Sequence, residues 1–259
     1  MEGLTVVKIG GKVIDNAPQL KQILTDFARI DGPKILIHGG GTLASEFGNK
    51  IGIESKMVEG RRITDAKSLD VVVMIYAGLI NKQIVATLQA EGCNALGLSG
   101  ADGNSIQAHK RSGTAIDYGF VGDIDNVNDQ LLQTLLATGF SPVFSAITHD
   151  HQGQLLNTNA DTIAASNASA MAPLYQVRLL ITFEQNGVLS DPEEPESIIP
   201  SISLAEFKAH QQSGVISNGM IPKLDNGFQA LADGVSEVMI CSYNKIASLE
   251  QPHTVLTLN

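Results

Sequence analysis

Cysteine is scarce in this chain, and it has no long apolar run. Its two cysteines, Cys93 and Cys241, lie far apart, and no CxxC motif or His/Cys cluster accompanies them. We expect both to be reduced core residues, with no metal site. The longest uncharged apolar run, 71–80, has ten residues, which is roughly half of the ~20 that a membrane-spanning helix needs. The sequence therefore predicts no membrane span.

Positive charge is also in short supply. The chain has 17 Lys and Arg against 27 Asp and Glu, a net charge of −10, which argues against nucleic acid as a partner. A small anionic substrate would have to be held by a local cluster of cations and amides. An N-terminus that carries Glu2 and runs directly into an apolar segment lacks the basic and apolar parts of a signal peptide, so the expected location is cytoplasmic.

Apolar strands alternate with helical segments through most of the 259 residues. This alternation predicts an α/β fold, in which helices cover both faces of a mainly parallel sheet. The expected strands are 4–9, 34–38, 93–98, 141–145, 177–182, 235–240 and 253–257. The expected helices are 18–30, 42–51, 65–91, 128–138, 159–171, 203–212 and 219–233. The best domain boundary lies near Pro173, where an alanine-rich helix ends and a new strand begins.

Two segments interrupt the alternation. Residues 104–127 are expected to form short antiparallel strands, with turns at 111–113 and 122–123. Residues 147–157 are expected to form a hairpin. Such inserts often form lids or dimer edges.

Two lysines stand where a cation is costly, each beside glycines. Lys8 ends the apolar run 4–7 and precedes Gly10 and Gly11, so its ammonium group needs an anion at the end of a buried strand. Lys223 follows residues that open a helix, where the backbone dipole disfavours a cation unless something negative is bound. A bound phosphate would satisfy both positions.

A glycine-rich segment lies between these lysines. Residues 38–41 read His-Gly-Gly-Gly, after an expected strand and before an expected helix, which is the arrangement of a backbone cradle for an anion. The segment also fits the GxGxxA dinucleotide fingerprint. However, residues 56–60 are too short and polar for the next buried strand of such a unit, and the fingerprint leaves both lysines unexplained. The P-loop pattern is absent, which argues against a Walker-type ATPase.

Asp161 falls in the first turn of an expected helix. A carboxylate there complements the helix dipole, and it could also lie between the two lysines and hold both ammonium groups in position. Arg61 and Arg62 follow a glycine. Each is either a solvated surface charge or the fork that binds a substrate carboxylate.

Seven short motifs together resemble those of the amino acid kinase family, in particular its acetylglutamate kinases. They cover nearly the whole chain in the family's order and spacing: KIGG at 8–11, HGGG at 38–41, EGRRIT at 59–64, GLSGADG at 97–103, FVGD at 120–123, NTNAD at 157–161 and GMIPK at 219–223. The resemblance implies the three-layer αβα sandwich of the carbamate kinase-like fold. It also implies an N-terminal lobe, 1–173, for acylglutamate binding and dimerisation, and a C-terminal lobe, 174–259, for ATP binding.

The resemblance also implies roles, position by position. The implied catalytic residues are Lys8 and Lys223, which would stabilise the transferring phosphoryl group, and Asp161, which would orient them. The implied binding residues are Gly10 and Gly11 for phosphate, Gly40, Gly41, Arg62 and Asn157 for the acceptor, and Glu184, Gly187, Gly219 and Met220 for the nucleotide. The loop 183–187 departs from the family, because Phe183 replaces a hydroxyl residue and Glu184 replaces an aspartate. Its detailed nucleotide contacts are therefore left open.

The activity implied by the resemblance is phosphorylation of the γ-carboxylate of N-acetyl-L-glutamate in arginine biosynthesis. ATP with Mg²⁺ would be the donor, and N-acetyl-L-glutamyl 5-phosphate the product. A carboxylate acceptor is already ionised at neutral pH, so catalysis needs alignment and charge stabilisation rather than a general base. The acyl group could instead be succinyl, which would require a further cation. The available cations are Lys12, Lys56, Arg61 and Lys110.

Other functions remain open at this level. Another amino acid kinase activity, such as that of a glutamate 5-kinase, would use the same fold. A non-catalytic sensor of nucleotide or amino acid would not need Lys8, Asp161 and Lys223 together. Family members that form arginine-inhibited hexamers carry a helix ahead of the first strand, and this sequence has none. The resemblance therefore implies an arginine-insensitive homodimer.

Overall fold

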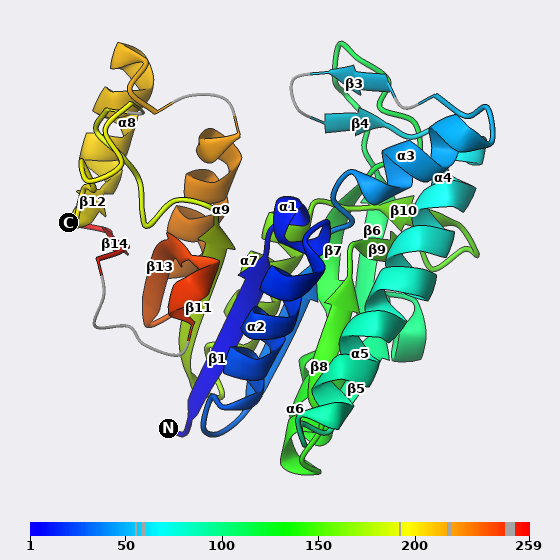
Figure 1. Ribbon diagram of the computed structural model, residues 1–259, viewed down its shortest axis with the longest axis horizontal. Coiled ribbons are helices and arrows are strands. Elements are labelled where there is room, and N and C mark those ends of the chain that lie inside the picture. Colours follow the sequence, from blue (N-terminus) through cyan, green and yellow to red (C-terminus); the bar gives the residue numbers. More distant parts are fainter. Residues whose placement is uncertain (55, 59–60, 192, 217–218, 247–251) are drawn as a thin grey trace.

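An eight-stranded sheet forms the centre of the computed structural model, which describes all residues except 55, 59–60, 192, 217–218 and 247–251 (Figure 1). Its strand order is β12-β14-β13-β11-β1-β2-β8-β5. Its strands are β1 (Gly3–Ile9), β2 (Lys34–His38), β5 (Ala95–Leu98), β8 (Ser141–Ser145), β11 (Gln176–Phe183), β12 (Ser201–Ser203), β13 (Glu237–Ser242) and β14 (Thr254–Thr257). The strands from β13 to β5 run parallel, and β14 pairs antiparallel with β13. The predicted mainly parallel sheet is confirmed.

Helices cover both faces of this sheet. They are α1 (Gly11–Ile14), α2 (Ala17–Ala28), α3 (Leu43–Lys50), α4 (Ala66–Val73), the π-helix η1 (Met74–Ile80), α5 (Asn81–Ala90), α6 (Asp129–Ala137), α7 (Ala160–Met171), α8 (Leu204–Ser213) and α9 (Met220–Ala232), with 3₁₀ turns η2 (Asp102–Asn104) and η3 (Tyr243–Lys245). On one face, α5 packs on β5 and β8 and contacts α2. On the other, α7 packs on β1 and β11 and contacts both α6 and α9. Figure 1 shows α2 in front of the sheet and α7 behind it.

Two of the central strands, β2 and β8, are buried along their whole length because both faces of the sheet are covered. Every residue of β2 and β8 is buried, as is typical of parallel strands between two layers of helices. The end of α2 is tied to the start of β2, since Lys34 Nζ donates to the carbonyls of Ala28 and Ile30 at 2.7 and 2.6 Å. This contact satisfies two carbonyls at a helix C-terminus. It also sets where β2 begins, five residues before the glycine-rich segment.

One long helix lies in the N-terminal half of the chain. The segments α4, η1 and α5 run on without a break over Ala66–Ala90, as the sequence predicted, although the π-helical middle was not expected. By length and apolar composition alone this helix could cross a membrane, but 44% of its most apolar window is buried inside the protein. A core helix of a soluble protein passes the same test, so the absence of a membrane span stays a prediction.

The two inserts form a second, four-stranded sheet of order β10-β9-β6-β7. Its strands are β6 (Ile106–Lys110), β7 (Gly122–Val127), β9 (Ile147–His149) and β10 (Leu155–Asn157). The predicted antiparallel strands and the hairpin are confirmed. The turn predicted at 122–123 is wrong, because Gly122 pairs with Lys110 and already belongs to β7.

A two-stranded hairpin, β3 (Lys56–Val58) and β4 (Arg61–Ile63), was not predicted. Neither was β12, and all three strands have only three residues. Glu59 and Gly60 of the EGRRIT motif lie outside the described residues, as does Asn218, the residue before the predicted helix 219–233. Cys93 and Cys241 are both buried, as expected of core residues, and no disulfide joins them.

Candidate active site at the carboxyl ends of the strands

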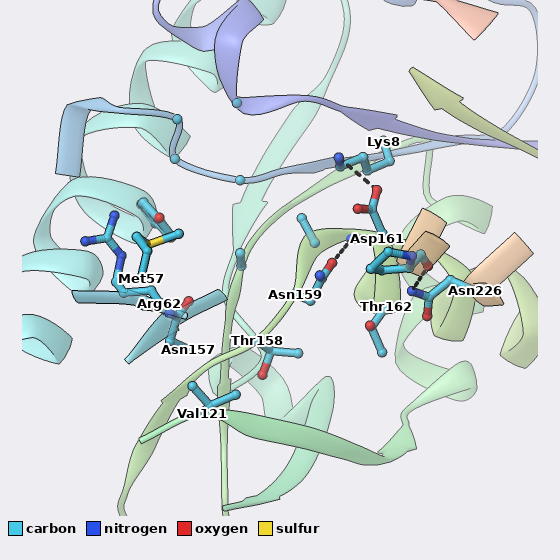
Figure 2. Close-up of a pocket in the computed structure, with 18 of the residues that line it drawn as sticks. Lys8, Met57, Arg62, Val121, Asn157, Thr158, Asn159, Asp161, Thr162 and Asn226 are labelled. Carbon is cyan, nitrogen blue, oxygen red and sulfur yellow. Dashed lines mark hydrogen bonds and ion pairs between the residues drawn. The ribbon is translucent and has the colours of Figure 1, made fainter. Parts of the chain in front are cut away.

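A cavity of about 360 Å³ lies beyond the carboxyl ends of β1 and β2. Ligands of parallel α/β sheets bind at this edge, and the volume is within the usual range for small-molecule sites. The cavity is lined by Lys8, Gly11, Gly39, Gly40, Gly41, Met57, Arg62, Tyr76, Arg111, Val121, Ala146, Asn157, Thr158, Asn159, Ala160, Asp161, Thr162, Pro222 and Asn226. In Figure 2, Lys8 and Asp161 lie on one side of the cavity, and Arg62 with Met57 on the other.

Asp161 holds both of the lysines that the sequence singled out. Lys8 Nζ lies 2.8 Å from Asp161 Oδ1, and Lys223 Nζ lies 3.0 Å from Asp161 Oδ2. The three side chains are 7%, 19% and 8% exposed for Lys8, Lys223 and Asp161. The lysines come from opposite ends of the chain, one from the end of β1 and one from the first turn of α9. The anion that each lysine required is therefore supplied by one protein carboxylate.

The local backbone places this carboxylate. Asn159 caps α7, and its side chain accepts a hydrogen bond from the Asp161 amide at 2.7 Å. Asp161 therefore stands in the first turn, where the helix dipole stabilises a negative charge. Asn226, one turn beyond Lys223 on α9, lines the same cavity.

Burial and charge act in opposite directions on this cluster. Burial raises the pKa of the Asp161 carboxyl, but Lys8 and Lys223 outweigh that effect and hold the pKa below its usual value. Burial, together with the charge of Lys223, lowers the pKa of the Lys8 ammonium, and Asp161 opposes that shift. Two ammonium groups facing one carboxylate leave one positive charge in excess. A buried excess charge favours an anionic ligand.

The two glycine segments touch each other beside this cluster. A Cβ built on Gly11 would lie 2.7 Å from Gly41 Cα, so a larger residue would push the segments apart. Asp15 ties them together, since the Thr42 amide and hydroxyl each donate to Asp15 Oδ2 at 3.0 Å. This contact satisfies the amide of Thr42, the N-cap of α3, with a side chain from another segment. Gly39, Gly40 and Gly41 are thereby held along the cavity.

Arg62 and Asn157 lie at the far side of the cavity from Lys8 (Figure 2). Arg62 Nη2 donates to Ser45 Oγ at 2.7 Å, and Asn157 Nδ2 donates to Thr64 Oγ1 at 3.0 Å. Both side chains are half-buried. A ligand with a carboxylate at each end could therefore reach Arg62 with one and the region of Lys8 with the other.

The comparisons with known proteins agree with this geometry. Residues 3–242 match the sequence pattern of the Amino acid kinase family. The chain belongs to that family. It is 54% identical to the acetylglutamate kinase of Bacteroides fragilis over 92% of each chain. The resemblance to acetylglutamate kinases predicted from the seven motifs is confirmed.

Two solved structures show the same fold. The structure of smu.665 from Streptococcus mutans UA159 is 24% identical, has a TM-score of 0.80 and covers 99% of each chain. Carbamate kinase from Giardia lamblia bound to AMP-PNP is 12% identical, with a TM-score of 0.70, over 100% of this chain and 99% of that one. The predicted carbamate kinase-like fold is confirmed.

Five residues that the resemblance assigned to phosphate or nucleotide do not line the cavity: Gly10, Glu184, Gly187, Gly219 and Met220. A Cβ on Gly187 would lie 2.7 Å from Thr254 Oγ1, so this glycine allows close packing. Glu184 is exposed and pairs with Lys12, Nζ to Oε2, at 3.3 Å. Gly219 is the N-cap of α9 and Met220 its first residue, about one turn before Lys223. Nucleotide contacts of these residues stay predictions.

Several cavity residues were missed by sequence reasoning, above all Arg111 and Tyr76. Arg111 follows β6, and its Nε lies 3.1 Å from both carboxylate oxygens of Asp123. Tyr76 lies in the apolar middle of a long helix, where nothing in the sequence distinguishes it from core. Among the cations proposed for a succinyl group, Lys12, Lys56 and Lys110 are exposed and do not line the cavity.

Proposed function

We propose that this chain transfers the γ-phosphoryl group of ATP to the γ-carboxylate of N-acetyl-L-glutamate, the acylglutamate step of arginine biosynthesis. The observation that carries the proposal is the pair of ammonium groups, Lys8 and Lys223, joined by Asp161 beside a glycine-lined cavity. An acetylglutamate kinase from Bacteroides fragilis, matched over 92% of each chain, supports the acceptor.

The chemistry follows from the charges of the site. Arg62 and Asn157 would hold the α-carboxylate and the amide of the acceptor, leaving its γ-carboxylate beside the glycine segments. An oxygen of that carboxylate attacks the γ-phosphorus, the bond from phosphorus to the bridging oxygen breaks, and the electron pair leaves with ADP. Lys8 and Lys223 stabilise the charge on the transferring group, with Asp161 orienting both. The acceptor has no proton to lose, so no base is required.

The magnesium ion is proposed to arrive with the nucleotide. Among the described residues, no group of three or more His, Cys, Asp or Glu could hold a metal ion. Mg²⁺ usually keeps several waters and binds substrate phosphates rather than a complete protein cage. It would neutralise charge on the phosphate oxygens. The residues of this chain would supply amides and ammonium groups around it.

The test is a coupled assay of ADP release, with hydroxylamine to trap the acyl phosphate. N-acetyl-L-glutamate is expected to give one hydroxamate per ADP, and free L-glutamate is expected to give neither. ADP release without an acylglutamate would contradict the proposal. So would turnover of free glutamate at the same rate, which would indicate a glutamate kinase.

A second acceptor, N-succinyl-L-glutamate, is favoured by Arg111. This guanidinium lines the cavity and engages Asp123, but its five donors leave capacity for a second carboxylate. A succinyl group carries such a carboxylate beyond its amide. The acetyl group does not.

Replacing Arg111 distinguishes the two acceptors. If Arg111 binds the far carboxylate, Arg111→Gln raises KM for N-succinyl-L-glutamate by about tenfold or more and changes KM for the acetyl substrate far less. The control is Arg178→Gln, which removes a comparable pair with Glu237 away from the site. Equal changes for both acceptors would show that Arg111 does not read the acyl group.

We also propose that the protein is a homodimer, and that the residues before and after about 173 form the acylglutamate and ATP lobes. One feature supports dimerisation: Met74 and Leu79 are 51% and 44% exposed on the long helix, and Met74 lines a hollow together with Leu69 and Leu155. Light scattering in solution is expected to give twice the mass of the chain. Met74→Lys is expected to lower this measured mass.

The cytoplasmic location and the absence of nucleic-acid partners stay predictions.

A further inference from the structure

His38 lies behind the glycine segment, fully buried, and its two ring nitrogens have defined partners. Nδ1 lies 2.8 Å from the carbonyl oxygen of Gly39, and Nε2 lies 3.1 Å from Nδ2 of Asn81. A carbonyl can only accept, so Nδ1 must carry the proton. Nε2 is then the acceptor for the Asn81 amide. Burial lowers the pKa of His38 to about 4, so this neutral tautomer persists at physiological pH.

Asn81 is itself held in one orientation. Its Nδ2 also donates to the carbonyl of Val143 in β8 at 2.9 Å, and its Oδ1 accepts from Lys82 Nζ at 3.1 Å. A flipped amide would turn its oxygen toward the Val143 carbonyl, which cannot donate, and its NH₂ group toward the Lys82 ammonium. The Asn81 side chain therefore fixes which nitrogen of His38 is protonated.

The bond from His38 determines where the next amide points. No peptide bond of the described residues is cis, and in a planar trans peptide the carbonyl and the N–H point in opposite directions. The Gly39 carbonyl is turned toward the buried His38. The N–H of Gly40, in the same peptide unit, must point the other way, toward the side where Gly39 to Gly41 line the cavity with Lys8.

The π-helix brings a second contact to the same segment. The Asn81 amide donates to the Tyr76 carbonyl, five residues back, so these residues lie one above the other. In an α-helix, five residues turn through about 500°, which would place them roughly 140° apart. Here Asn81 reaches His38, and the Tyr76 ring covers Gly40 so closely that an added Cβ would lie 1.5 Å from Cε1. Short π segments often mark functional sites.

We propose that His38 is a positioning residue. Asn81 holds His38 in its tautomer, and His38 directs the Gly40 N–H into the cavity, where this amide stabilises charge on the transferring phosphoryl group. The inference rests on the proposed kinase function for its catalytic consequence. The orientation of the peptide itself does not depend on that function.

Steady-state kinetics test the catalytic consequence. Asn81→Ala and His38→Leu are expected to lower kcat by about 10- to 100-fold. A misaligned Gly40 N–H would stabilise the transition state less and would affect substrate binding little. KM for both substrates should change by less than about threefold. His38→Asn, which keeps an amide donor near the position of Nδ1, should recover part of the loss relative to His38→Leu.

The matched control is Asn167→Ala. Asn167 is also a fully buried helical asparagine, and its Nδ2 donates to the Ile163 carbonyl at 2.8 Å, but it does not line the cavity. It should lose stability and keep its kcat. If Asn81→Ala folds and keeps kcat within about threefold, or if His38→Asn is no better than His38→Leu, the positioning role is wrong.

Nuclear magnetic resonance tests the geometry without turnover. With ¹⁵N-histidine, the His38 signal, assigned through His38→Asn, should show Nδ1–H and an unprotonated Nε2 between about pH 5 and 8. With ¹⁵N-glycine, Asn81→Ala should shift the Gly40 amide, whereas Asn167→Ala should not. An Nε2–H tautomer, or an unshifted Gly40 amide, overturns the inference. Failure of the wild type to phosphorylate any acylglutamate would overturn only the proposed function.

Discussion

Lys8→Ala is expected to lower kcat by about 10²- to 10³-fold, the usual cost of removing one donor that stabilises transition-state charge. Lys8 lies at the end of β1 with its ammonium 2.8 Å from Asp161, on the cavity wall. In the proposed reaction its charge acts on the phosphoryl group during transfer, so KM for the acylglutamate should change much less than kcat. Lys223→Ala is expected to behave alike, since its ammonium meets the same carboxylate.

Stopped-flow or coupled assays on both single variants and the double variant make this measurement. The double variant should lose less than the product of the two single losses if both lysines act on one charge, as proposed. Lys34→Ala is the control for removing a buried lysine, because Lys34 donates to carbonyls at the end of α2, lies over the Phe27 ring and does not line the cavity. It should lower stability and leave kcat unchanged. Equal losses in kcat and acceptor affinity for Lys8→Ala would contradict the assigned role.

The regular part of the fold could be predicted from local pattern. The strands 34–38 and 141–145 agree with β2 and β8 to the residue, since buried parallel strands are continuous apolar runs between clear breaks. The three-residue strands β3, β4 and β12 were missed because so few residues show no period. The π-helix was missed as well. Its i→i+5 hydrogen bonds change which side chains of the long helix face the sheet, and the apolar sequence of this helix does not indicate that change.

The cluster of Lys8, Asp161 and Lys223 was predictable for a different reason. Lys8 and Lys223 are out of place as isolated residues, and a cation in a buried position indicates an unseen partner. The sequence suggested both phosphate and Asp161 as that partner, and the structure places Asp161 between the lysines. By contrast, Arg111 sits in an insert whose position over the cavity depends on tertiary packing. No local signal distinguishes it from a surface arginine.

The same logic applies to His38. Its place beside three glycines was noted, yet its partner Asn81 is 43 residues away and meets it only through the packing of the long helix. The tautomer of the His38 ring depends on that contact. Sequence can therefore predict the glycine cradle, whereas the direction in which its amides point requires the structure.

Asp161→Asn is expected to lower both activity and stability, although the side chain keeps its shape. An amide offers one acceptor oxygen and would turn its NH₂ group toward the second lysine, so Lys8 and Lys223 can no longer both be held. Removing one partner from a buried ion pair costs about 3–5 kcal/mol. Loss of alignment should lower kcat by about tenfold or more.

The stability difference should depend on pH in one direction. The two lysines hold the pKa of Asp161 below its ordinary value of 3.8. The folded state therefore binds this proton less readily than the unfolded state, and the carboxylate stabilises the fold above the unfolded pKa. That contribution is lost as the pH falls through the lower, folded pKa. Wild type and Asp161→Asn should differ most near neutral pH and converge in acid.

Urea unfolding from neutral pH to about pH 3 measures this convergence. Asp26→Asn is the matched control, because Asp26 is a buried carboxylate whose Oδ1 accepts from the neutral side chain of Gln22 at 3.0 Å. It should keep kcat and lose less stability than Asp161→Asn at neutral pH. A constant gap between wild type and Asp161→Asn across the whole pH range would mean that Asp161 is not the charged centre between the lysines. The ion-pair cluster would then have a packing role only, and phosphoryl transfer would need another source of charge stabilisation.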